Sequence, residues 1–268
     1  MTRLKPSPAD GRNHAEVTPD KLKILHSKTS RVAKVLEQAL GVPVQASTLP
    51  RPLDMLIATI LSQNTNDKNS HRAYRQLRKK YHRWQDVAEA PIRSIISAIR
   101  VGGMANQKSP RIKETLHAVK DRFGRYDLSA LLKMTSDEVL GELTKINGVG
   151  VKTASCVLLF SMGRDVFPVD THVHRLCGRL GLAPGCSTPE KTFHFMQGVF
   201  PKGKGYSFHT NLIRFGRRVC RSNNPACDIC PLYDECVFPG KKRGLKVKRV
   251  VSGTDHDFML LDNVKVAH

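Results

Sequence analysis

The chain has 268 residues, 40% of them hydrophobic and 25% charged, a composition that is ordinary for a protein with a sizeable core and excludes a disordered or fibrous one. Lysine and arginine number 44 against 23 acidic residues, and the resulting formal charge of +21 indicates a polyanionic partner. No uninterrupted apolar run approaches the ~20 residues of a membrane-spanning helix, so nucleic acid is a better candidate than a lipid surface.

The N-terminal residues are polar and include acidic side chains, which argues against a transit peptide and predicts a flexible arm over residues 1–19. Since no signal-like apolar segment follows, we expect an intracellular protein located with its DNA or RNA. Apolar residues at helical spacing then predict a helix over residues 20–40, and Gly41 with Pro43 ends it.

The next segment, Leu53 to Ser62, is almost entirely apolar and predicts a buried helix. Gln63 and Asn64 lie in the following loop, and Asn66 predicts the cap of a basic helix with a largely solvated face. Further amphipathic helices are predicted over residues 84–90, 92–100, 107–123, 170–180, 188–198 and 206–217. No alternating strand is evident, so the fold class is predicted to be all-α.

A helix-hairpin-helix is predicted over residues 136–163. Thr135 with Glu138 forms a capping box, and apolar residues at helical spacing then continue to Ile146. Gly148 and Gly150 bracket one valine in a turn whose backbone can take positive φ, and an apolar second helix follows. The alternative is that this turn merely separates two helices.

The start of the second helix offers unpaired backbone N–H groups and a positive dipole end, so a phosphate diester is expected to bind at Gly148 and Gly150. Lys152 lies just inside this helix. The dipole and partial burial would favour its free amine, which can attack a carbon and form a Schiff base.

Four of the seven cysteines, Cys220, Cys227, Cys230 and Cys236, follow the spacing CxxxxxxCxxCxxxxxC. An intracellular protein keeps its thiols reduced, so this spacing indicates metal binding rather than disulfides. Structural zinc commonly pairs two CxxC units across a longer loop, whereas single cysteines flanking one CxxC suit a [4Fe-4S] cluster. We predict the cluster and keep structural zinc as the alternative.

The hairpin with its lysine, the sequence Val169-Asp170-Thr171-His172 and the cysteine spacing together resemble the endonuclease III family of DNA glycosylases over roughly residues 20–240. This resemblance implies two lobes with a DNA cleft between them. The predicted divisions are the arm, an iron-sulfur cluster domain of residues 20–44 plus 166–237, a six-helix domain of residues 45–165, and a basic C-terminal tail of residues 238–268.

The resemblance also implies that Lys152 is the Schiff-base lysine and Asp170 the catalytic aspartate. Displacing a damaged base builds positive charge on the sugar, which a nearby carboxylate stabilises before the amine captures C1′. Asp170 is equally suited to be the N-cap of the helix at residues 170–180. Gln63 or Asn64 and the apolar Met104 match positions that fill the space of an extruded base, although loop and packing roles are the alternatives.

We therefore predict a monomeric bifunctional DNA glycosylase and AP lyase of base excision repair. Its expected partner is double-stranded DNA with damaged bases, chiefly oxidised pyrimidines, or abasic sites, and no membrane is expected. One alternative is a monofunctional glycosylase for mismatched uracil, thymine or adenine, whose relatives generally lack the lysine at position 152. The other is a non-catalytic DNA-binding module. The basic tail is a localisation signal, a contact to phosphates or a solvated segment.

Overall fold

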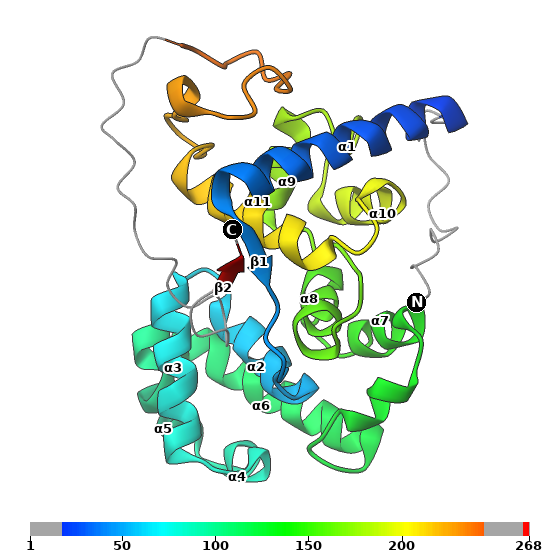
Figure 1. The fold of residues 1–268 in the computed structure, drawn as a ribbon. Coiled ribbons are helices and arrows are strands. Elements are labelled where there is room, and N and C mark those ends of the chain that lie inside the picture. Colours follow the sequence, from blue (N-terminus) through cyan, green and yellow to red (C-terminus); the bar gives the residue numbers. More distant parts are fainter. Residues whose placement is uncertain (1–17, 244–264, 268) are drawn as a thin grey trace.

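The protein is built from helices joined by short connections, as shown in Figure 1 by a computed structural model that describes residues 18–243 and 265–267. In chain order the α-helices are α1 (Pro19–Leu40), α2 (Pro52–Ser62), α3 (Asp67–Lys80), α4 (Trp84–Glu89), α5 (Ile92–Ile99), α6 (Ala105–Phe123), α7 (Ser136–Thr144), α8 (Val151–Met162), α9 (Thr171–Arg179), α10 (Pro189–Val199) and α11 (Gly205–Arg218). Short 3-10 helices are η1 (Arg100–Gly102), η2 (Ser129–Lys133) and η3 (Cys227–Ile229). The all-α fold class is confirmed.

Two three-residue strands were not predicted. β1 (Val42–Val44) pairs antiparallel with β2 (Lys265–Ala267), so that the Cα of Val42 lies opposite that of Ala267. Three residues are too few to show alternation, and Pro43 weakens any strand signal. Residues 1–17 of the predicted arm (1–19) and residues 244–264 and 268 of the predicted basic tail (238–268) lie outside the described residues, and α1 already begins at Pro19.

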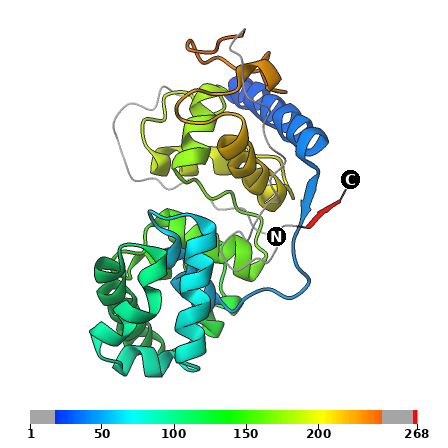
Figure 2. The ribbon, with the colours of Figure 1, turned by 90° about the vertical axis from the view of Figure 1, so that its left-hand side faces the viewer.

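The helices form two lobes, which Figure 2 shows one above the other. In the upper lobe α1 packs on α10 and α11, and α11 packs on α9. In the lower lobe α2 packs on α3 and α6, and α5 packs on α6. Helix α8 contacts α2 and α7 as well as α10 and α11, so it bridges the lobes and holds its N-terminus between them. The domain boundaries stay predictions.

The residues buried in the core closely match the apolar positions of the sequence. Helix α2 is buried from Pro52 to Leu61 apart from the half-buried Asp54, and α8 is buried from Thr153 to Ser161. In α1, Leu25, Val32 and Leu36 are buried, as their spacing predicts. Leu22 was expected on the same face but is exposed, because residues 18–24, which include the first turn of α1, are exposed on every side of the helix.

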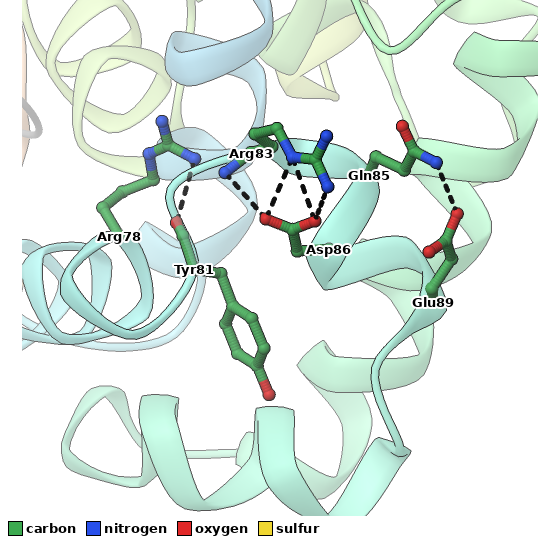
Figure 3. Close-up of polar contacts among 6 residues, drawn as sticks. All are labelled: Arg78, Tyr81, Arg83, Gln85, Asp86 and Glu89. Carbon is green, nitrogen blue, oxygen red and sulfur yellow. Dashed lines mark hydrogen bonds and ion pairs between the residues drawn. The ribbon is translucent and has the colours of Figure 1, made fainter.

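Polar contacts hold the surface of the corner between α3 and α4 (Figure 3). Arg83 donates from Nη2 to Oδ1 of Asp86 at 2.7 Å, and its backbone N–H donates to Oδ2 of the same carboxylate at 3.3 Å, which closes the start of α4. Beneath it the buried Trp84 donates from Nε1 to Oδ1 of Asp54 at 2.9 Å. This bond fastens α4 to the N-terminal turn of α2, at the end of α2 opposite the Gln63–Asn64 loop.

Candidate functional site

The hairpin begins and ends as its sequence requires. The predicted capping box is present at the start of α7, and α7 ends at Thr144, before the predicted Ile146. Ile146 and Val149 are each 3% exposed and anchor the connecting turn in the core. Gly148 takes φ +78°, whereas Gly150 has φ −83° and serves as the N-cap of α8. Within this turn the positive φ that the sequence allows is therefore taken by Gly148 and not by Gly150.

The two glycines also differ in their surroundings. A Cβ on Gly150 would meet nothing within 4 Å, so the exposed side of the turn stays open to a ligand at the first N–H groups of α8. A Cβ on Gly148 would come within 1.5 Å of Nη1 of Arg111, whose guanidinium on α6 lies directly against the turn. This nitrogen is buried and has no hydrogen-bond partner among the residues that the structure describes. It places a positive charge behind the predicted phosphate site.

Lys152 and Asp170 line one cleft between the lobes. Lys152 lies in the first turn of α8, and Asp170 is the N-cap of α9, where its Oδ1 accepts from the backbone N–H of Val173 at 2.7 Å. The predicted cap is thus present, and it fixes the carboxylate without taking it out of the cleft. The cleft holds about 520 Å³, within the range of small-ligand sites.

The Gln63–Asn64 loop forms one wall of this cleft, together with Thr65. Asn64 adopts the left-handed conformation, with φ +51°, and its side chain is exposed. Met104 is not among the residues lining the cleft. It precedes α6 as its N-cap with φ +52° and is 41% exposed, so the alternative of a methionine buried between helices is wrong.

The opposite wall comes from α9 and α11. It contributes His172, the last residue of the motif at residues 169–172, and two side chains that the sequence did not single out, His209 and Ile213. Arg217, on the last turn of α11, bonds Asp67 at the start of α3 and so connects the two lobes beside the cleft. His172 accepts a hydrogen bond at Nδ1 from Arg175 at 3.3 Å, and burial lowers the pKa of its imidazole.

His209 lies fully buried beneath the cleft. Its Nδ1 bonds the carbonyl oxygen of Pro168 at 2.9 Å; since a carbonyl only accepts, this nitrogen carries the proton. The rings of Phe160 and Phe167 contact the imidazole edge-on at 5.6 and 6.2 Å between centroids. Burial lowers the pKa of His209 to about 4, so the ring is neutral at pH 7.

The four predicted cysteine ligands line a second pocket, after the C-terminal end of α11. Within the described part of the chain, no three His, Cys, Asp or Glu side chains are grouped as they would be around a single metal ion. The four thiols line the same pocket.

Cationic side chains surround this pocket. Arg179 donates to Sγ of Cys220 at 3.3 Å and to the carbonyls of Arg221 and Ser222 at 2.7 and 2.9 Å. Lys241 donates to the carbonyl of Cys236 at 2.8 Å. Burial raises the pKa of the Cys220 thiol, and it raises that of Cys230 to about 11, so both are protonated unless a bound metal removes the proton.

Sequence reasoning missed Arg111, His209 and Arg179. Each lies in an ordinary amphipathic helix, and none belongs to a recognisable motif. Cys156 and Cys177, outside the predicted ligand set, are fully buried in the core. No described helix is long and apolar enough to cross a membrane.

Comparison with known proteins identifies the family. Residues 57–202 match the profile described as HhH-GPD superfamily base excision DNA repair protein. An endonuclease III of Thermotoga maritima is 34% identical over 187 residues, which are 70% of this chain and 83% of the relative. A provisionally named DNA glycosylase of Arabidopsis thaliana is 38% identical over 189 residues, 67% of this chain and 64% of that longer relative.

The fold agrees with these matches. A solved structure of a trapped endonuclease III–DNA covalent intermediate superimposes with a TM-score of 0.65 at 26% identity, covering 81% of this chain and 95% of that one. The chain belongs to the HhH-GPD superfamily of base excision DNA repair glycosylases and, within it, to the endonuclease III family.

Proposed function

We propose that the protein is a bifunctional DNA glycosylase and AP lyase that excises oxidised pyrimidines from double-stranded DNA. The observation that carries this proposal is the shared cleft of Lys152 and Asp170, each held at the start of a helix. Family membership and the trapped covalent complex of a relative support the same chemistry. The charge of +21 and the open hairpin turn support DNA as the partner.

In the proposed reaction, Asp170 stabilises the positive charge that develops on the sugar as the bond between C1′ and the base breaks. The neutral amine of Lys152 forms a new bond to C1′, and the base leaves with the bonding electrons and takes up a proton. The nitrogen then becomes part of a protonated Schiff base as the sugar ring opens. Loss of a proton from C2′ expels the 3′ phosphate, and water finally releases the lysine.

Borohydride trapping tests the covalent step. The protein is mixed with a duplex containing one abasic site and reduced, and the adduct is resolved by denaturing electrophoresis. Lys152→Ala should abolish the adduct. The matched control is Lys145→Ala, because Lys145 belongs to the same hairpin but lies on its surface, paired with Glu142 at 2.7 Å. No adduct from the wild-type protein would overturn the lyase assignment.

The substrate proposal is tested with a panel of duplexes. An oxidised pyrimidine should be released faster than a mismatched thymine, uracil or adenine, and release should accompany strand cleavage. Base release from the mismatched duplexes without cleavage would support a monofunctional glycosylase instead. Binding without release from any duplex would support a non-catalytic module.

We also propose that Cys220, Cys227, Cys230 and Cys236 hold a [4Fe-4S] cluster. The shared pocket and the surrounding Arg179 and Lys241 support an anionic group with four thiolate ligands. When bound, the cluster would cross-link a segment that has little regular structure of its own. Purified protein should absorb broadly at about 400 nm and contain iron and sulfide. Colourless protein with one zinc per chain would contradict this assignment.

A further inference from the structure

Lys108 is a buried lysine. Neither the fold class nor the proposed chemistry explains its burial. It lies in the first turn of α6 with a relative exposure of 5%. Its Nζ donates to the carbonyl oxygen of Leu61 at 2.7 Å and to that of Gly102 at 2.9 Å. Burial lowers the pKa of the amine to about 8, as expected for a cation in an apolar setting.

The two carbonyls lie just before the two loops predicted to enter DNA. Leu61 lies in the last turn of α2, just before Gln63 and Asn64. Gly102 ends η1, two residues before Met104. A single ammonium group therefore joins the ends of two short elements whose last carbonyls have no partner within their own helix.

The loops have a second feature in common. Among the described residues, non-glycine residues with positive φ are confined to Asn64, Met104 and Asn224. The first two occupy the predicted insertion positions, at φ +51° and +52°. Such backbone strain persists only where surrounding contacts enforce it, and it concentrates at functional sites. The bonds to Lys108 lie three residues before Asn64 and two before Met104.

Packing restrains the same arrangement. A Cβ on Gly102 would come within 2.9 Å of the Cβ of Ala73, so η1 lies directly against α3. Helix α3 starts from the N-cap Asn66, immediately after the first loop. The second loop is thus connected to the first both through α3 and through Lys108.

We propose that Lys108 is a positioning residue that sets the spacing between the two loops, so that Asn64 and Met104 enter the duplex together. This inference rests on the proposed function. Extruding a stacked base requires the vacated space to be filled, and two fillers held at a fixed spacing need no ordering at the moment of insertion. Lys108 does not line the cleft, and it acts through the loops rather than on the sugar.

The test compares Lys108→Met with Lys113→Met. Methionine keeps most of the apolar stem and removes the donors. Lys113 is a matched control because it lies on the same helix and donates to one backbone carbonyl, that of Ala90, at 2.8 Å, away from both loops. Two rates are measured: base release from a duplex with a damaged, paired base, and borohydride trapping on a duplex that already contains an abasic site.

Lys108→Met should lower base release at least tenfold and change trapping less than threefold, since an abasic site has no base to unstack. Lys113→Met should change neither. Equal losses in both assays, or no loss in either, would overturn the proposal. Absence of trapping by the wild-type protein would instead be a failure of the proposed function.

A second variant covers the case in which Lys108→Met does not fold. Gly102→Ala keeps the lysine but pushes η1 away from Ala73, so it should reproduce the selective loss of base release. Fluorescence of 2-aminopurine placed beside the lesion should show less unstacking with this variant than with wild type. Wild-type unstacking by a folded Gly102→Ala protein would contradict the role of loop spacing.

Discussion

The cleft and the cysteine pocket are organised in different ways. Lys152 and Asp170 sit at the starts of α8 and α9, above a core in which α8 is almost wholly buried. The cysteines occupy a segment whose regular structure is the three-residue η3, held by Arg179, Lys241 and turns. Apolar burial therefore positions the cleft, whereas polar contacts hold the cysteine segment, which the proposed cluster would order further.

This difference predicts how substitutions in the two regions will affect stability and activity. Where packing fixes the geometry, a functional side chain can be replaced without loss of stability, and activity and stability should separate. Where bonds around a bound group fix the geometry, replacing one neighbour should loosen the segment locally.

The largest effect is expected from Asp170→Asn. Asparagine caps a helix about as well as aspartate, so α9 and the unfolding free energy should be preserved. The missing negative charge should slow base release on the order of 10²–10⁴-fold. Single-turnover kinetics on an oxidised-pyrimidine duplex and urea unfolding measure the two quantities. A variant that loses stability in proportion to its activity would erase the proposed contrast.

Acid should destabilise the core beneath the cleft through His209. The folded-state pKa is about 4, below the ordinary 6.5, so below pH 6.5 the unfolded state binds a proton that the native state does not. The contribution of the neutral His209 ring to the unfolding free energy is fully present above pH 6.5. It is lost as the pH falls toward 4, by about 3 kcal/mol in total. Urea unfolding between pH 7 and 4.5 should show the unfolding free energy falling as the pH falls. His209→Gln should weaken this pH dependence. The control variant His117→Gln, at an exposed histidine, should leave the pH dependence of the unfolding free energy unaltered.

The hairpin glycines should respond unequally. Gly148→Ala places a side chain at φ +78° and against Arg111, and it should cost about 1–2 kcal/mol for the left-handed backbone alone. Gly150→Ala meets no neighbour at φ −83° and should leave stability unchanged. Urea unfolding of both variants measures the two changes in unfolding free energy. Equal losses of unfolding free energy in the two variants would show that neither the positive φ of Gly148 nor its contact with Arg111 is what requires glycine.

The smallest global effect is expected from Arg179→Ala. This change removes the bonds to Cys220 Sγ and to the carbonyls of Arg221 and Ser222, yet the unfolding free energy should fall by less than about 1 kcal/mol, because the segment can open locally. Bleaching of the absorbance near ~400 nm by a chelator should accelerate severalfold. Bleaching at the wild-type rate would mean that Arg179 does not secure the segment.

Much of the fold could be predicted because it depends on apolar spacing and caps. The buried helix at Leu53 to Ser62, the Asn66 cap and the Thr135–Glu138 capping box all follow from local rules, and the structure confirms them. The pairing of β1 with β2 could not be predicted, because it joins residues more than 200 positions apart with three residues on each side.

The site was predictable to the extent that motifs mark it. Lys152, Asp170, Gln63 and Asn64 do line one cleft, although their roles stay predictions. His209 and Lys108 could not be found in this way, since a histidine or lysine in an amphipathic helix carries no sign that its side chain turns inward. Their partners are backbone carbonyls, which every residue offers, so only the three-dimensional packing selects Pro168, Leu61 and Gly102.

The central claim, that Lys152 supplies the nucleophile, is tested most directly by locating the covalent bond. The borohydride-trapped complex is digested with nuclease and protease, and the modified peptide is sequenced by mass spectrometry. The reduced sugar remnant should be attached to Nζ of Lys152. A remnant on a different lysine, or on the N-terminal amine, would contradict the account.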